Sequence, residues 1–248
     1  MGGWSTSAAA ACTWSARGPE RRWSCLWPGS ATAARQPGRG YRASWPDRPA
    51  PASTTGPGSA TATPTPASYQ RAVNDLHALL RAGHVPGPYL LVGHSLGGLL
   101  ARLYADGHPA GVAGLVLVDA TPVDWFPTVQ RLLPAALRGP LAHNPEGFDL
   151  NHGLASLTPL DRPGALGRRP LAVLWAPNQP PPGLPAATAQ ELGRRWEAEQ
   201  SRLGRLSAAS RLQRVAGGGH YLQRDQPQLV IDAINQVLRA AHRAAAAR

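Results

Sequence analysis

The sequence predicts an α/β fold with a mostly parallel sheet flanked by helices. Short aliphatic runs indicate buried strands at residues 89–92, 115–118, 171–175 and 212–215. The segments between them carry apolar residues at helical spacing. Strands that alternate with helices along a chain pair in parallel. No apolar run approaches the roughly 18 residues that a membrane span needs, so we expect a soluble protein.

Helices are expected at residues 70–82, 99–106, 188–206 and from about 227 to 238. The first has its apolar residues on one face, at Val73, Leu76, Leu79 and Leu80. Gly107 and Pro109 end the second helix. Asp225 is the expected N-cap of the last helix, with Pro227 in its first turn.

Composition excludes several classes of protein. The 248 residues suit one domain with a single core. The net charge of +11 comes from 25 basic residues, all arginine and scattered along the chain, and aromatics are only 6%, so we expect no nucleic-acid partner. The only cysteines, Cys12 and Cys25, exclude a disulfide framework or a cysteine metal site in the main domain.

Residues 1–68 differ in character from the rest of the chain. They contain no Val, Ile or Phe and a single Leu, Leu26, so they lack the residues of buried parallel strands. We expect a low-complexity, disordered segment here, followed by the folded core at 69–248. Five of the eight Trp fall in this segment, which is unusual for a disordered tail. The alanine run at 8–11 is too short for a secretory signal, so we expect a cytoplasmic protein.

Gly93-His94-Ser95-Leu96-Gly97 matches the G-x-S-x-G nucleophile elbow. It stands directly after a predicted strand and opens a predicted helix, as the elbow requires. Gly93 and Gly97 allow the backbone to pass closely around a strained serine, so the Ser95 hydroxyl is exposed. The Leu96 amide at the helix N-terminus is the expected oxyanion donor. The alternative is a glycine-rich turn without catalytic function.

A serine hydroxyl needs a general base, and His220 is the best candidate. It follows the last predicted strand and three glycines that free its loop to reach over the elbow. We expect His94 to point away from the site as a packing residue. His77, His84 and His108 lie on or beside surface helices.

Residues 69–243 resemble the carboxy-terminal two thirds of an α/β-hydrolase. The resemblance rests on Gly-His-Ser-Leu-Gly-Gly at 93–98, Leu-Val-Leu-Val-Asp-Ala at 115–120 and Gly-His-Tyr-Leu-Gln-Arg-Asp-Gln-Pro at 219–227. It implies a triad in the order Ser, acid, His. The usual place for the acid, after the strand at 171–175, holds no carboxylate through residue 183. Asp119, one strand earlier, is therefore the expected acid, and Asp124 is the reserve candidate.

The resemblance also places a helical cap at about 121–167. Its apolar residues either line an acyl-binding cleft or form the cap's own core: Trp125, Phe126, Leu132, Leu133 and Leu137. The implied activity is hydrolysis of a carboxylic ester or related small acyl substrate, without metal or organic cofactor. Ser95 argues against an epoxide hydrolase or haloalkane dehalogenase, which would carry Asp at the elbow. An inactive remnant or a binding module is the alternative, and the oligomeric state stays open.

Nothing in residues 1–68 resembles the early strands or the second oxyanion donor of this family. A shifted reading frame could explain their loss. In this frame, each codon's third base is joined to the first two bases of the next codon. The codons for residues 53–64 then permit Tyr-Asp-Arg-Pro-Gly-Leu-Gly-Tyr-Ser-Asp-Pro. The codons for residues 23–31 permit Val-Val-Leu, two unassigned residues, and then Ala-Gly-Leu-Gly. Both resemble motifs that the family carries before its elbow. This interpretation predicts that no strand from the first 66 residues pairs with the sheet; a genuine low-complexity tail is the alternative.

Overall fold

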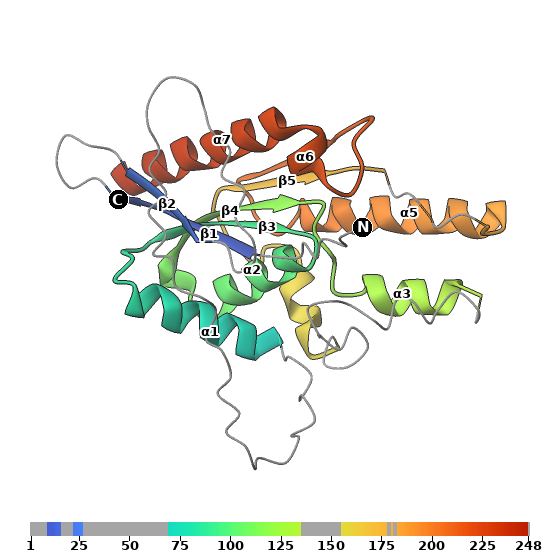
Figure 1. The fold of residues 1–248 in the computed structure, drawn as a ribbon, viewed down its shortest axis with the longest axis horizontal. Coiled ribbons are helices and arrows are strands. Elements are labelled where there is room, and N and C mark those ends of the chain that lie inside the picture. The colour runs from blue at the N-terminus through green and yellow to red at the C-terminus, as the bar shows by residue number, and fades with distance from the viewer. Residues whose placement is uncertain are drawn as a thin grey trace, which may run out of the picture.

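The computed structural model describes residues 9–15, 22–26, 69–134, 155–177, 180 and 183–247. Its strands form one six-stranded sheet in the order β2-β1-β3-β4-β5-β6 (Figure 1). The strands are β1 Ala9–Ser15, β2 Arg22–Leu26, β3 Tyr89–His94, β4 Val112–Val118, β5 Leu171–Trp175 and β6 Ser210–Arg214. Strands β3 to β6 run parallel to one another, whereas β1 is antiparallel to both β2 and β3.

Helices lie on both faces of this sheet. They are α1 Tyr69–Ala82, α2 Leu96–Gly107, α3 Trp125–Leu132, α5 Ala186–Leu203, α6 Leu222–Asp225 and α7 Pro227–Ala246, with 3-10 turns η1 Pro109–Gly111 and η3 Ala155–Asp161. Helices α1 and α2 cover one face, and α7 covers the other (Figure 1). The mostly parallel sheet flanked by helices confirms the predicted fold class.

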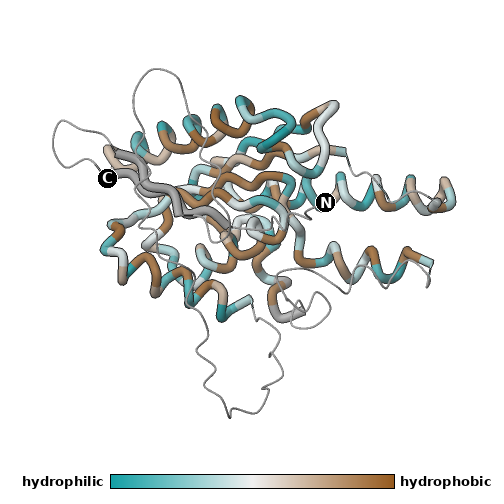
Figure 2. The backbone as a smooth tube through the Cα atoms, in the orientation of Figure 1, coloured by the Kyte–Doolittle hydropathy of each residue, from teal (hydrophilic) through white to brown (hydrophobic). Residues whose placement is uncertain are grey.

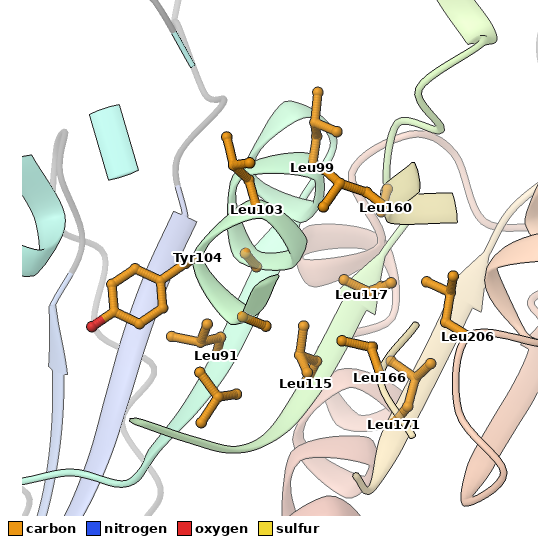
Figure 3. Packing of buried hydrophobic residues seen from close by; sticks show 14 of the residues in the cluster. Leu91, Leu99, Leu103, Tyr104, Leu115, Leu117, Leu160, Leu166, Leu171 and Leu206 are labelled. Carbon is orange, nitrogen blue, oxygen red and sulfur yellow. The ribbon is translucent and has the colours of Figure 1, made fainter. Parts of the chain in front are cut away.

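Two apolar cores follow from the alternation of side chains along β4. Leu115 and Leu117 point to the face of α1 and α2, where they pack with Leu91 and Leu99 (Figure 3). Val116 and Val118 point to the opposite face, where α7 packs. A parallel strand buried on both faces has to be apolar at every position, because successive side chains face opposite ways. The central strands are accordingly hydrophobic along their length (Figure 2).

The strands and helices predicted after residue 68 are all present, with bounds that differ by a few residues. Strand β4 begins at Val112 rather than at Leu115, and β6 covers Ser210–Arg214 rather than 212–215. The described part of the expected cap contains α3 and η3 and no strand. Residues 135–154 of the expected cap lie outside the described residues. None of the described helices is both long and apolar enough to cross a membrane.

The prediction that the first 66 residues contribute no strand to the sheet is wrong. Strand β1 pairs with β3 through residues 9–12, and β2 pairs with β1. The aliphatic criterion applies to parallel strands buried on both faces, whereas this antiparallel ribbon lies at the edge. Thr and Trp in these segments favour extended backbone. These pairings contradict that one expectation of the out-of-frame interpretation; the interpretation itself stays a prediction, and residues 27–68 lie outside the described residues.

Candidate active site

Ser95 occupies the sharp turn between β3 and α2. Its φ of 52° and ψ of −125° lie where residues other than glycine are strained. A Cβ on Gly93 would come within 2.6 Å of the backbone of both Gly97 and Gly98, so only glycine fits there. Leu96 is the first residue of α2, and the amide of such a residue has no acceptor within its own helix. The turn therefore has the strained geometry expected of a nucleophile elbow.

Asp119 and His220 are in direct contact. The Oδ2 atom of Asp119 lies 2.7 Å from Nδ1 of His220. Its other oxygen, Oδ1, accepts a hydrogen bond of 2.9 Å from the amide of Ala176, so both carboxylate oxygens have partners. Because an ionised carboxylate only accepts, Nδ1 carries the proton of the neutral imidazole and Nε2 is left as an acceptor. This is the tautomer that a general base needs.

Ser95, Asp119 and His220 line one cavity of about 320 Å³, within the range of small-molecule sites. The rest of its lining is largely apolar, from Thr121, Trp125, Phe126, Pro177 and Trp196. Ser95 and Asp119 directly follow β3 and β4, and His220 lies in the loop after β6, so all three lie beyond the carboxyl ends of parallel strands.

The apolar residues named for the expected cap differ in what they contact. Trp125 and Phe126 line the cavity. Leu132 and Leu133 pack with Val129 and with Leu192 of α5, in a cluster that Trp125 also joins. Leu137 lies outside the described residues.

Trp196 is a lining residue that sequence reasoning missed. It comes from α5, meets Trp125 edge-on with ring centroids 4.7 Å apart, and donates from its indole to the carbonyl of Ala176 at 2.9 Å. Its spacing from Leu192 marks it as a residue of the buried helix face. Spacing alone does not indicate which cavity that face lines.

The loop after Asp119 is held by a buried polar network. Asp119 has a φ of 44°, a strained value for a residue with a Cβ. Arg102 donates to the carbonyl of Thr121 at 2.7 Å and lies 3.3 Å from the Asp161 carboxylate, with both side chains buried. Asp161 also accepts from the amide of Val123 at 2.8 Å. Burial lowers the pKa of Arg102, while the charge of Asp161 opposes this change.

The other two aspartates considered have different partners. Asp124, the reserve acid, accepts from Arg202 at 2.8 Å rather than contacting a histidine. Asp225 does not cap the last helix, because Gln226 holds the N-cap position and Pro227 begins α7. The Asp225 carboxylate accepts instead from the amide of Gly219 at 2.8 Å. Because Pro227 is the first residue of α7, the helix starts one residue later than predicted. Asp225 instead stabilises the loop that carries His220.

His94 is buried and does not line the cavity, as expected of a packing residue, but the residue it packs against is His220. Its ring centroid lies 4.6 Å from that of His220, because the end of β3 and the loop after β6 meet at the same edge of the sheet. His77 and His108 stack on each other, 4.0 Å apart, and line a separate, open hollow of about 670 Å³. That hollow has no serine, cysteine or carboxylate in its described lining. Across the described residues, no three His, Cys, Asp or Glu side chains gather into a possible metal site.

Comparisons with known proteins identify the family. A family model described as alpha/beta hydrolase fold matches residues 23–231, most of the chain. A search of curated protein sequences finds no match. Among solved structures, the chain is similar to a probable hydrolytic enzyme of Pseudomonas aeruginosa PAO1, with 20% identity, 70% of each chain covered and a TM-score of 0.46.

It is also similar to a thermophilic esterase of Thermogutta terrifontis, with 21% identity, coverage of 73% of this chain and 75% of that one, and a TM-score of 0.44. Both values of identity are low, so the assignment depends on the family model, whose match includes Ser95, Asp119 and His220. The chain belongs to the family of proteins with the alpha/beta hydrolase fold.

Proposed function

We propose that this chain is a serine hydrolase that cleaves a carboxylic ester or a related acyl compound. The observation that carries the proposal is the contact of 2.7 Å between Asp119 and His220, at a cavity that Ser95 also lines. Membership of a hydrolase family supports the reaction class. The strained backbone of Ser95 supports its role as nucleophile, because such strain is found where function requires a fixed geometry.

The proposed reaction passes through an acyl-enzyme. Ser95 Oγ attacks the acyl carbon while its proton moves to Nε2 of His220, which acts as general base. The oxyanion that forms receives a hydrogen bond from the Leu96 amide. His220 then donates the proton to the leaving alcohol, and the ester bond breaks. A water molecule, activated by His220 in the same way, releases the acid and restores Ser95.

Asp119 has the role of orienting His220 and stabilising the imidazolium that forms during each step. In this mechanism it does not take the proton from His220. The described lining of the cavity offers Trp125, Phe126 and Trp196 to the substrate and contains no arginine. This lining favours an uncharged, apolar group on the acyl or alcohol side of the bond.

A fluorophosphonate probe tests the proposal, because it reacts with serines that a neighbouring base activates. We expect the full chain to be labelled at Ser95 and Ser95→Ala to be unlabelled, with parallel loss of hydrolysis of a short p-nitrophenyl ester. Folded protein that is neither labelled nor active would contradict the proposal and favour a binding module. Comparing hydrolysis of that ester with hydrolysis of the p-nitroanilide of the same acyl group shows whether the chain prefers esters or amides.

A further inference from the structure

The mechanism above makes no use of His94, a polar residue that is buried directly beside the nucleophile. It is the last residue of β3 and immediately precedes Ser95. Only 3% of its surface is exposed. Burial of an imidazole removes it from water, so its nitrogens need partners within the protein. One of those partners lies in the loop of the base.

Nε2 of His94 lies 2.7 Å from the backbone carbonyl oxygen of His220. A carbonyl oxygen only accepts, so Nε2 carries a proton and donates it. The two rings are also close, with centroids 4.6 Å apart and planes 47° apart. His94 therefore contacts His220 both at its main-chain carbonyl and at its ring.

The loop that His94 contacts includes three consecutive glycines, Gly217 to Gly219, and Gly217 has a φ of 73°. Glycines lose the most conformational freedom when a loop becomes fixed, so such a loop depends on specific contacts. The side chain of His220 is 47% exposed, and packing alone fixes it weakly. Asp225 holds the amide of Gly219, and His94 holds the carbonyl of the next residue.

We propose that His94 is a positioning residue that fixes the backbone of His220 relative to the elbow. The inference depends on the proposed function, because it gives His94 its role through the general base. His94 is joined to Ser95 by a peptide bond, so one side chain ties the base to the nucleophile. A misplacement of about 1 Å in a catalytic group can cost about 10²-fold in rate. The proposed role depends on the hydrogen bond that Nε2 of His94 donates to the carbonyl of His220.

Two substitutions of similar length separate that hydrogen bond from packing. Gln at position 94 keeps a donor near the place of Nε2, whereas Met keeps the bulk without a donor. We expect His94→Met to lower kcat about 10-fold to 100-fold with KM nearly unchanged, and His94→Gln to restore most of kcat. His77→Ala, at a histidine outside the site, is the control and should keep the kcat of the native chain.

A double-mutant cycle tests whether His94 acts through the base. In a His220→Ala background, His94→Met should leave the residual turnover unchanged, because residues that act as a unit are not additive. A further fall would mean that His94 supports the elbow itself, and it would overturn the proposal. Equal kcat for His94→Met and the native chain, or equal loss in His94→Met and His94→Gln, would also overturn it. If the Met variant does not fold, His94→Ala replaces it.

Hydrogen exchange of residues 216–222 gives a readout that does not depend on activity. We expect faster exchange in His94→Met than in the native chain and in His94→Gln. If the native chain has no turnover that depends on Ser95, the proposed function fails, and faster exchange would still show that His94 holds the loop. Unchanged exchange of residues 216–222 in His94→Met would also contradict the proposal that His94 fixes this loop.

Discussion

Replacing Asp119 by Asn changes one atom, and the structure predicts which way the new amide faces. The carboxylate accepts from the Ala176 amide through Oδ1 and contacts Nδ1 of His220 through Oδ2. The carbonyl oxygen of Asn has to face Ala176, because the opposite orientation would place two N–H donors against each other. The amide nitrogen then faces Nδ1 of His220.

This orientation forces His220 into the wrong tautomer. Nδ1 has to accept from the Asn amide, so the proton of the neutral ring moves to Nε2, the atom that should take the proton of Ser95. In serine hydrolases the corresponding Asp to Asn change lowers turnover by about 10⁴. A loss of that size corresponds to about 5 kcal/mol in the activation free energy. Stability should change little, since the shape of the side chain and the Ala176 contact are kept.

The measurement is kcat for a short chromogenic ester, with the fraction of folded protein taken from its thermal transition. Asp124→Asn is the matched control: it removes a carboxylate whose partner, Arg202, forms a partly exposed ion pair worth about 0 to 1 kcal/mol. It should leave turnover within a few-fold of the native value. Asp119→Asn within tenfold of the native chain, or a larger loss in Asp124→Asn, would refute the assignment of the acid.

Two further predictions concern stability. A Cβ on Gly98 would collide with the side chain of Ala120, so Gly98→Ala should cost about 1 to 3 kcal/mol in urea unfolding; Gly193→Ala, where nothing lies within 4 Å, should not destabilise, and equal stability of the two would contradict the packing argument. Burial, and then the charge of His77, lower the pKa of His108 below its ordinary 6.5. The unfolded chain then binds more protons than the folded one just below pH 6.5, so stability falls as the pH drops through that window. Between about pH 7 and pH 5, the Tm of His108→Gln should therefore fall by less than the Tm of the native chain. An equal fall in both chains would contradict the argument.

The central sheet was predictable because its strands are apolar on both faces. The runs Leu115 to Val118 and Leu171 to Trp175 satisfy two cores at once, and few sequences other than buried strands do so. The edge ribbon β1 and β2 was not predictable from this rule. Strand β2 is the outermost strand and β1 joins it to β3, and the pairing of both depends on backbone hydrogen bonds, which every residue except proline can make. Composition therefore gives a weak signal there.

The proposed triad residues could be picked out because each has a local signal. Ser95 stands in a five-residue motif, Asp119 ends a strand, and His220 follows a glycine run. The residues that surround them have no such signal. Trp196 lies on α5, and its place in the cavity depends on how α5 packs against α3. His94 is part of the motif, but its contact lies 126 residues away and depends on where the last loop folds back.

Ser95 and Asp119, the proposed nucleophile and acid, are positioned in a different way from His220, the proposed base. The amide of Ser95 donates to the carbonyl of Val118 at 3.1 Å, and the amide of Asp119 donates to that of Leu174 at 2.7 Å, so each residue is tied to the strand beside its own. Backbone pairing across β3, β4 and β5 thus fixes the distance between these two, whatever side chains surround them. His220 depends instead on side-chain contacts to a glycine-rich loop. Substitutions that loosen the site without unfolding the sheet should therefore displace the base first, and lower kcat before they change the geometry of the elbow.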